Sequence, residues 1–504
     1  MSLSEPKPGA HLELLKSLSS AVPKGLKVER ERRIFVNRNL RMDEIDLIGF
    51  DMDYTLALYN QKNLEGLSIK CTLDKLIKQR GYPEDILKLK YDPLFAVRGL
   101  VVDRKHGNIF KMDRYGHVGR VFHGKRPLGK EERHLLYRTE RIRLSLPRYA
   151  WIDTLFALPE AVMYAAIIDF LEARGDKIHY SQLWQDIRDS IDEAHRDESM
   201  KRIIKANLSD YITRDPELAP TLHKFRSSGR RLFLLTNSAW DYTEAVMHYL
   251  LDGSLPTYTT WRSYFDIIIV SGAKPGFFTE RKPFIEVDPA TGASRGSLEE
   301  GAQFVRNRVY QGGNIQDFET AAGAGKDRVL YIGDHIYGDM LRAKKSSVWR
   351  TAMILQELEL EIRQYERFKD RLNRLESLER QLLRDESDVS YQQLLLKEVQ
   401  KLEGGGHDAD LVEAAKREAK HRLDDLRASL KAVAEEMEAI EGEVDSAFNP
   451  YWGAIFREGA ENSRFGQQVD DYACVYTSRV SNFLSYSPLR YFRSPRDHMP
   501  HELV

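Results

Sequence analysis

Short apolar runs, each followed by polar residues, recur along the chain and predict the strands of one sheet. The clearest runs cover residues 46–50, 231–235, 265–270 and 328–332, with helical patterns between them. Strands that are buried on both faces give continuous apolar runs, and their alternation with helices is typical of a parallel, doubly wound α/β sheet. Such sheets bind ligands at the carboxyl edge, where the polar residues after each run would gather.

Other patterns predict helices and a small antiparallel sheet. A helix over residues 72–79 is expected to stop at Gly81-Tyr-Pro83. The stretch 124–207 is predicted to be mainly helical, with its clearest helices at 158–173 and 181–206. Three short runs separated by turn-like residues predict an antiparallel meander, at 99–103, 108–112 and 118–122.

A long charged segment, from Leu355 to Val444, is dominated by Glu, Arg, Lys, Leu and Ala. This composition predicts two long helices, with a reversal at Gly404-Gly-Gly406. We favour an intramolecular hairpin whose helices close on each other, and the alternative is an arm that binds a partner or oligomerises. The second helix has the alternating four- and three-residue apolar spacing of a coiled-coil seam, at Ala419, Leu423, Leu426, Leu430, Val433, Met437, Ile440 and Val444.

These changes of pattern divide the chain into six expected segments. Three of them form the sheet and the cap that is inserted into it, and the other three lie outside the sheet. The segments are a lead at 1–29, a first core part with the meander at 30–123, a cap that selects the substrate at 124–207, a second core part at 208–356, the helical arm at 357–446 and a C-terminal segment packing on the core at 447–504.

Composition and charge narrow the class of protein. Of the 504 residues 42% are hydrophobic, so the chain can bury a sizeable core and is not a disordered tail. Lys and Arg number 76 and Asp and Glu 77, which leaves a net charge of −1 and argues against bulk binding of a nucleic-acid polymer or a membrane. No apolar run approaches the ~20 residues of a membrane span. With only Cys71 and Cys474 a disulfide framework is excluded, and we expect a cytoplasmic protein.

The sharpest chemical signal is Asp51-x-Asp53-x-Thr55, directly after the first predicted strand. Two carboxylates on such a turn can converge on one phosphoryl group. Asp51 can attack phosphorus as a nucleophile, and Asp53 can protonate the leaving oxygen and later deprotonate water. An ordinary turn in which the Asp side chains cap the backbone is the alternative.

Three further sites after predicted strands strengthen the chemical interpretation. Thr236 and the amide of Asn237 could bind a phosphate oxygen, and Lys274 could neutralise both the phosphate and the nucleophile. Asp334 and Asp339 lie among small residues after the last strand, and carboxylates of this kind suit Mg²⁺. Each residue alone has an ordinary structural explanation, but all follow strands whose carboxyl ends meet at one edge.

The order of these motifs resembles the haloacid dehalogenase-like phosphohydrolases and, among them, the cytosolic purine 5′-nucleotidase family that prefers IMP and GMP. The resemblance covers roughly residues 30–355 and 447–504 and does not explain the helical arm. The phrases that carry it are Ile34-Phe-Val-Asn-Arg38, Gly49-Phe-Asp-Met-Asp-Tyr-Thr-Leu56, Leu155-Phe-Ala-Leu-Pro-Glu160, Trp261-Arg-Ser-Tyr-Phe-Asp266, Tyr331-Ile-Gly-Asp-His-Ile-Tyr-Gly-Asp339 and Met499-Pro-His-Glu502.

The resemblance implies a Rossmann-like core of the haloacid dehalogenase type, an inserted, mainly helical cap and a Mg²⁺ cofactor. It makes Asp51 the nucleophile and Asp53 the general acid and base, and it gives the metal to Asp51, Asp53 and Asp334. Asp339 would support the metal indirectly, either through a bound water molecule or through contacts with the residues that bind the metal. It assigns phosphate binding to Thr236, Asn237 and Lys274.

The resemblance also implies a purine-binding wall in the cap. Its stacking residue usually precedes Asn, whereas this chain has Ala157, and Arg196 stands where an aromatic residue often follows the histidine. Purine over pyrimidine is therefore expected, while hypoxanthine against guanine stays open. Without the resemblance the helix around residue 190 would be taken for an exposed ion-pair face. The residues assigned to the nucleotide are Phe156, which would stack on the base, Arg188, Asp192, His195, Lys201 and Ser238.

The resulting hypothesis is a Mg²⁺-dependent 5′-nucleotidase that hydrolyses purine nucleoside monophosphates through an aspartyl phosphate, with nucleoside phosphotransfer as a side reaction. We expect a homo-oligomer, a dimer or a tetramer, with neither a nucleic-acid nor a membrane partner. One alternative is a phosphatase of the same fold that acts on a non-nucleotide phosphometabolite. The other is an oligomerising scaffold with vestigial catalysis.

Overall fold

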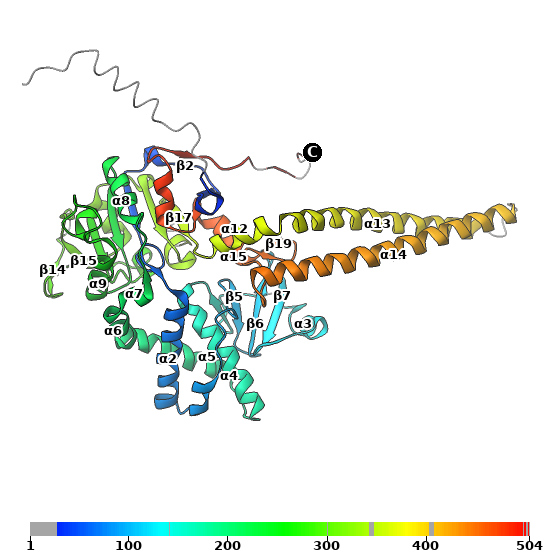
Figure 1. Cartoon of the computed structure of the whole chain (residues 1–504), viewed down its shortest axis with the longest axis horizontal. Coiled ribbons are helices and arrows are strands. Elements are labelled where there is room, and N and C mark those ends of the chain that lie inside the picture. The colour runs from blue at the N-terminus through cyan, green and yellow to red at the C-terminus, as the bar shows by residue number, and fades with distance from the viewer. Residues whose placement is uncertain are drawn as a thin grey trace, which may run out of the picture.

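The computed structural model describes residues 28–140, 142–299, 301–341, 347–402, 408–496, 498–499 and 502. The lead up to residue 27, the reversal at 404–406 and part of the 499–502 phrase lie outside the described residues. Within them the chain forms a ten-stranded sheet with packed helices, a smaller sheet, and a helical hairpin that extends away from the body (Figure 1). In the described part, no helix has the length and apolar character that crossing a membrane requires.

The large sheet confirms the predicted α/β class. Its central seven strands, from β20 to β15 in the order below, are parallel to one another. The order is β1 (Phe35–Val36), β20 (Val475–Thr477), β17 (Arg350–Ile354), β16 (Val329–Gly333), β3 (Leu47–Phe50), β11 (Arg231–Leu235), β12 (Ile267–Val270), β15 (Val309–Gly312), β13 (Phe284–Val287) and β14 (Ser294–Ser297).

Alternate residues of the central strands enter two separate hydrophobic cores. In β3, Ile48 and Phe50 pack in one core and Leu47 packs in the other. In β11, Leu232 and Leu234 join the first core, whereas the neighbouring side chains join the second. Side chains alternate between the faces of a strand, so a sheet covered on both faces requires the unbroken apolar runs seen in the sequence.

The edges of the sheet extend beyond the four predicted strands. β17 and β20 continue the parallel part, and β20 comes from the C-terminal segment, so this segment is built into the sheet. β1, β13 and β14 add antiparallel pairs at the two edges. Two-residue β1 and the exposed, polar β14 carry too little apolar signal to be recognised from periodicity.

A layer of helices covers the carboxyl edge of the sheet. α2 (Gln61–Arg80) packs against α4 (Leu158–Ala173), α5 (Tyr180–Arg196) and α6 (Ser199–Ala206). The helix expected at 72–79 therefore begins earlier, at Gln61, where the Asn60 side chain accepts a hydrogen bond from the Asn63 amide and caps it. The helix expected over 181–206 is two helices, because Glu198 takes a left-handed backbone conformation with φ 63°.

The predicted meander is confirmed and is part of a five-stranded antiparallel sheet. Its order is β8 (Arg126–Pro127), β7 (Val118–His123), β6 (Asn108–Met112), β5 (Leu100–Asp103) and β9 (Tyr149–Ile152). β9 lies in the stretch that was expected to be mainly helical. Its pairing with β5, and the packing of α2 on the helices after residue 157, join segments on both sides of the expected boundary at 123.

The charged segment forms the hairpin of α13 (Lys369–Leu402) and α14 (Ala409–Phe448), which pack against each other. Of the predicted seam, Ala419, Leu423, Val433, Ile440 and Val444 are buried. Arg374 donates two hydrogen bonds to Glu436 across the hairpin, at 2.7 and 2.8 Å. The intramolecular hairpin is therefore the observed arrangement of this seam.

The remaining elements connect these units. They are the helices α3 (Lys130–Tyr137), α7 (Leu208–Tyr211), α8 (Leu218–Ser227), α9 (Trp240–Leu251), α10 (Ile315–Ala322), α12 (Leu358–Arg367) and α15 (Arg464–Tyr472), and the short strand pairs β10 (Ile212–Thr213) with β4 (Leu58–Tyr59), β2 (Leu40–Arg41) with β21 (Tyr491–Phe492), and β18 (Arg457–Glu458) with β19 (Glu461–Asn462).

Candidate active site

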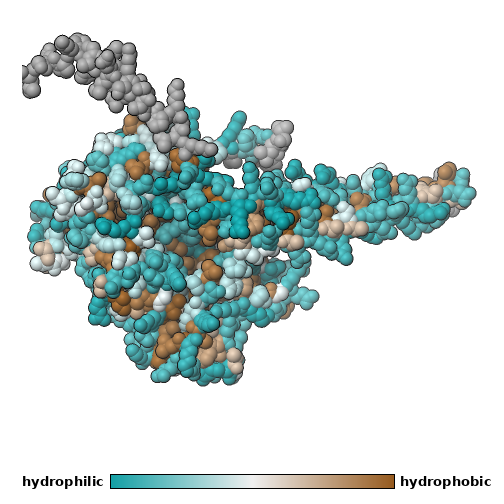
Figure 2. All heavy atoms as spheres, in the orientation of Figure 1, coloured by the Kyte–Doolittle hydropathy of each residue, from teal (hydrophilic) through white to brown (hydrophobic). Residues whose placement is uncertain are grey.

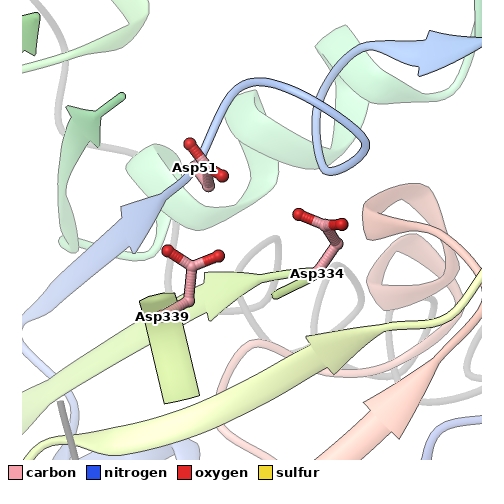
Figure 3. Close-up of side chains that lie close together, drawn as sticks. All are labelled: Asp51, Asp334 and Asp339. Atoms are coloured by element: carbon pink, nitrogen blue, oxygen red, sulfur yellow. The ribbon is translucent and has the colours of Figure 1, made fainter. Parts of the chain in front are cut away.

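Four loops meet at the carboxyl edge of the large sheet. They follow β16, β3, β11 and β12, which are neighbours in this order in the sheet. Asp51 follows β3, and Asp334 and Asp339 follow β16; Figure 3 shows their carboxylates directed toward a common space. The predicted convergence of strand-end residues is thus present in the structure.

The three carboxylates form a compact buried cluster. Asp51, Asp334 and Asp339 each offer an oxygen atom, and these three atoms lie within 4.8 Å of one another. Burial is the main cause that raises the pKa of Asp51 well above its usual value, and the carboxylates of Asp339 and Asp334 raise it further. Burial likewise raises the pKa of Asp334 to about 7. Burial and the neighbouring carboxylates therefore disfavour three simultaneous negative charges in this cluster.

Lys274 supplies the positive charge inside this cluster. Its Nζ lies 2.9 Å from Asp51 Oδ1 and 2.7 Å from Asp339 Oδ1, and it donates to the Tyr331 hydroxyl at 2.9 Å. Burial alone would lower the pKa of Lys274, but Asp339 and Asp51 outweigh it and raise this pKa well above the usual value. A permanently charged amine thus holds the predicted nucleophile in place.

Asp53 has a different environment from the other acids. Its Oδ1 accepts a hydrogen bond from the Tyr59 hydroxyl at 2.6 Å, and its Oδ2 accepts one from Ser238 Oγ at 2.8 Å. Tyr59 in turn lies 2.8 Å from the Tyr242 hydroxyl. Burial raises the pKa of Asp53, and the hydrogen bonds from Tyr59 and Ser238 oppose this rise. The carboxylate of Asp53, which was predicted to bind the metal together with Asp51 and Asp334, is not part of the three-acid cluster, and Asp339 takes its place there.

The predicted phosphate residues after β11 lie at different depths. Thr236 is fully buried, its hydroxyl accepts a hydrogen bond from the Ser238 amide at 3.1 Å, and it does not line the cavity. Asn237 lines the cavity, and its side chain exchanges two hydrogen bonds with the backbone of Lys274, at 2.6 and 2.9 Å. Asn237 therefore ties the loop after β11 to the loop after β12.

Local backbone strain accompanies these loops. Tyr54 has φ 57° in the loop after β3, and Ser271 and Ala273 have φ 47° and 52° in the loop that carries Lys274. Left-handed conformations are unfavourable for residues with a Cβ atom, and they persist where surrounding contacts fix the chain. The sequence contains no glycine at these positions that would have indicated the strained turns.

Arg98 is a residue that the sequence analysis missed. It is fully buried, and its Nε and Nη2 donate to the two carboxylate oxygens of Glu357, at 2.7 and 2.6 Å. Its Nη1 donates to the backbone carbonyl of Asp334 at 2.8 Å and lies 3.9 Å from the carboxylate of that residue. Arg98 thus fixes the loop of Asp334, although no local pattern around residue 98 indicates this role.

His335 links the same loop to the cap side of the site. Its Nε2 lies 2.9 Å from Asp153 Oδ2, and its backbone amide donates to Asp339 Oδ2 at 3.2 Å. Burial would lower the pKa of His335, but Asp153 and the other nearby carboxylates raise it to about 9. The protonated ring is therefore a second cation beside the acidic cluster.

A cavity of about 460 Å³ opens above the cluster, between the sheet edge and the helical layer. Its floor includes Asp51, Lys274 and Asp334, and a cap wall faces them. Phe156 is in edge contact with His195, with their ring centroids 6.0 Å apart. Burial lowers the pKa of His195, which favours its neutral form. The residues predicted to bind the nucleotide all line this cavity, namely Phe156, Arg188, Asp192, His195, Lys201 and Ser238.

Arg188 is held by an acid that the sequence analysis did not assign. Glu160 is buried in the first turn of α4, and its two oxygens accept hydrogen bonds from Arg188 Nη1 at 3.1 and 3.0 Å. Burial raises the pKa of Glu160 to about 7 although Arg188 lowers it. An acid after Pro159 at a helix start is a common stabilising pattern, so the sequence offers no reason to single it out.

The fold and this cluster define a class of protein. A carboxylate at a strand end, a buried lysine beside it and an acidic pocket for a cation are suited to phosphate-ester chemistry, in which positioned charges do most of the catalysis. The class is that of an α/β phosphoric monoester hydrolase.

Comparison with known proteins gives the family. The 5′ nucleotidase family matches residues 34–504. A 5′-nucleotidase domain-containing protein of Dictyostelium discoideum is 30% identical over 476 residues, covering 93% of this chain and 74% of that protein. The 5′-nucleotidase domain-containing protein 2 of Rattus norvegicus is 28% identical over 483 residues, covering 93% of this chain and 80% of that protein. The chain therefore belongs to the 5′-nucleotidase family.

A solved structure of low sequence identity also aligns with this chain. A 2-haloacid dehalogenase from Pseudomonas syringae aligns with 62% of this chain and 86% of its own, at 15% identity and a TM-score of 0.21. This likeness is too distant to bear on function.

Proposed function

We propose that this protein is a Mg²⁺-dependent 5′-nucleotidase that hydrolyses purine nucleoside 5′-monophosphates of the IMP and GMP type. The observation that carries the proposal is that one cavity has Asp51, Lys274 and Asp334 on its floor and Phe156 and His195 in its wall. Its volume of about 460 Å³ is within the range that small-molecule ligands occupy. A phosphate on the floor and a base at the wall would fill it.

The residues present fit a divalent cation. Three buried carboxylates face Lys274, while the other two nearby cations, Arg98 and His335, pair with Glu357 and Asp153. Within the described chain, Asp334 Oδ2 is buried and has no hydrogen-bond partner, which is the state of an oxygen that awaits a cation. Asp51, Asp334 and Asp339 would hold Mg²⁺, which when bound would neutralise charge on the transferring phosphoryl group.

In the first half-reaction, an oxygen of Asp51 attacks the phosphorus atom and the bond from phosphorus to the 5′-oxygen breaks. Asp53 gives its proton to that oxygen, so the nucleoside leaves neutral. The raised pKa of Asp53 favours the protonated acid that this step needs. Tyr59 and Ser238 hold the carboxyl group in position through their hydrogen bonds.

In the second half-reaction, water attacks the phosphorus of the aspartyl phosphate while Asp53 takes its proton. The bond from phosphorus to Asp51 breaks, which releases phosphate and restores the enzyme. Lys274 stays within reach of Asp51 throughout and stabilises the negative charge on both sides of the reaction. A nucleoside hydroxyl in place of water would give phosphotransfer by the same steps.

Base recognition is proposed for the cap wall. Phe156 offers a ring edge or face to the base, and the neutral His195 can exchange hydrogen bonds with it. Glu160 occupies Nη1 of Arg188 and Asp192 Oδ2 lies 3.9 Å from its Nε, so Nη2 is the donor that we propose for a 6-oxo group. Asp192 and Lys201 complete this wall.

We further propose that the enzyme is cytoplasmic, which is consistent with two free cysteines. We also propose that it is a homo-oligomer.

The test is phosphate release with Mg²⁺ from IMP, GMP, AMP, UMP, CMP and a set of sugar phosphates. We expect the two 6-oxopurine nucleotides to have the highest kcat/KM, and Asp51→Asn to abolish turnover without loss of fold. Equal rates on sugar phosphates would favour the phosphometabolite alternative, and turnover by Asp51→Asn would refute the covalent route. If no phosphate is released from any of these esters, the result would favour the alternative of an oligomerising scaffold with vestigial catalysis.

A further inference from the structure

Both chain segments that join the helical arm to the body contact the loop that carries Arg98. Figure 1 shows the arm projecting from the body, so the two meet at the base of the arm, and most of the arm surface in Figure 2 is hydrophilic. The outgoing segment contributes Glu357, the N-cap residue of α12, and the returning segment, residues 449–452, follows α14. We name Glu357 and residues 449–452 the arm base.

The returning segment fixes the loop of residues 92–98. Asn449 Nδ2 donates a hydrogen bond to the backbone carbonyl of Leu94 at 2.8 Å. Trp452 is fully buried, its Nε1 donates to the backbone carbonyl of Phe95, and the two rings pack with their centroids 6.0 Å apart. The loop is therefore held in place only a few residues before the arginine.

The outgoing segment holds the guanidinium of Arg98 itself. Nε and Nη2 donate to the two oxygens of Glu357 at 2.7 and 2.6 Å, which is the bidentate geometry of a strong Arg–carboxylate pair. Nη1 is the nitrogen that contacts Asp334. It donates to the backbone carbonyl at 2.8 Å and stays 3.9 Å from Oδ2, which is too far for a hydrogen bond. Glu357 thus directs Arg98 to the backbone of Asp334 and not to its carboxylate.

This arrangement leaves the carboxylate of Asp334 free for a cation. Among the residues that the structure describes, Asp334 Oδ2 has no hydrogen-bond partner, although a buried guanidinium is its neighbour. Opposite charges attract strongly in a buried site, and a movement of about 1 Å would bring Nη1 within hydrogen-bond distance of this oxygen. A guanidinium paired there would compete with Mg²⁺ for the same oxygen, and the pairing of Arg98 with Glu357 prevents this competition.

We propose that Glu357 is a positioning residue for the metal site, because it keeps Arg98 away from the carboxylate of Asp334 and so leaves that carboxylate to Mg²⁺. The arm base is then a support of the metal site, which connects the arm to catalysis without any contact between the arm and the substrate. The inference rests on the proposed function, since it requires the Mg²⁺ site at Asp51, Asp334 and Asp339.

The first test measures Mg²⁺ binding by full-length Glu357→Gln. Gln has nearly the same shape and can accept one hydrogen bond from Arg98, but it no longer balances the charge of the guanidinium. The dissociation constant is obtained from the rise in melting temperature with Mg²⁺ concentration. We expect it to increase roughly 10- to 100-fold, while kcat at saturating Mg²⁺ stays within about threefold of the wild type. An unchanged dissociation constant would overturn the proposal.

Glu359→Gln is the matched control. Glu359 lies two residues further along, in the first turn of α12, and pairs with Arg479. The variant removes the same charge and an ion pair of the same kind, but it leaves Arg98 and Glu357 in place. Equal losses of Mg²⁺ affinity in the two variants would overturn the proposal, because the charge of the helix and not the position of Arg98 would then explain them. Melting temperatures with metal chelated show whether both variants fold.

The second test adds Arg98→Met to Glu357→Gln. If a released guanidinium blocks Asp334, its removal should return the Mg²⁺ dissociation constant to within about threefold of the wild type. An ion pair that only stabilises the fold predicts the reverse, since the double variant has lost every contact of the pair. A double variant that binds Mg²⁺ no better than Glu357→Gln would overturn the proposal. Because it buries no unpaired charge, the double variant should bind Mg²⁺ even if Glu357→Gln alone does not fold.

Failure of this inference and failure of the proposed function give different results. A wild type without Mg²⁺-dependent stabilisation would refute the metal site and this inference together. A wild type that binds Mg²⁺ but releases no phosphate from nucleotides would refute the nucleotidase alone, because the comparison of Mg²⁺ affinities needs no substrate.

Discussion

Substitution of the buried acid Glu160 by Gln is the prediction that the structure defines most closely. The two oxygens of Glu160 accept hydrogen bonds from Arg188, and the side chain is almost completely shielded from water. Gln has nearly the same shape and keeps one carbonyl oxygen that can accept from Arg188, but it cannot ionise. Glu160→Gln therefore removes a titration while it preserves the packing.

The pKa of Glu160 determines the size and sign of the effect. It rises from an ordinary 4.5 to about 7 in the folded protein, chiefly because the carboxyl group is buried. The folded state thus binds this proton more tightly than the unfolded state. Its contribution to stability is fully present below about pH 4.5 and is lost as the pH rises through 7. The loss corresponds to about 3 kcal/mol of unfolding free energy.

Denaturant unfolding of wild type and variant from pH 5 to pH 8, with metal chelated, measures the difference. The stability of Glu160→Gln relative to wild type should increase by about 2.5 kcal/mol between pH 5 and pH 8 and should level off above pH 7.5. Glu172→Gln, on the same helix, is the control, because the pKa of Glu172 is lowered rather than raised. A pH-independent difference for Glu160→Gln, or one that decreases with pH, would refute the reasoning.

Two further predictions concern the floor of the site and the arm. Lys274→Met should lower kcat about 10²- to 10³-fold, because it removes the charge that contacts Asp51; a loss of less than tenfold in steady-state phosphate release would contradict this role. Gln392 is buried in the hairpin, and within the described chain its Oε1 has no hydrogen-bond partner. Gln392→Leu should therefore raise the unfolding free energy of the arm by about 1–2 kcal/mol, and unchanged or lower stability in thermal melts followed by circular dichroism would count against it.

The sequence determines the local elements and the position of the acids. Continuous apolar runs require strands with two buried faces, and the polar residues after them fall at the carboxyl edge. The loops of Asp51, Lys274 and Asp334 could be predicted to meet for this reason. The seam of α14 could be predicted in the same way, because a 3.6-residue periodicity is a property of consecutive residues.

The tertiary structure alone decides which distant residues complete the site. Arg98 meets Glu357, Tyr59 meets Asp53 beside Ser238, and Glu160 meets the guanidinium of the base wall. Most of these partners lie far apart in the chain, and their side chains have no periodicity that could reveal the pairing. Similarly, the edge strand β20 joins the sheet from the C-terminal segment. Hydrophobic patterns specify which face of an element is buried, whereas only the packing of the whole chain specifies which other element covers that face. Buried charges need partners, and the fold decides which groups, however distant in the sequence, lie close enough to pair with them.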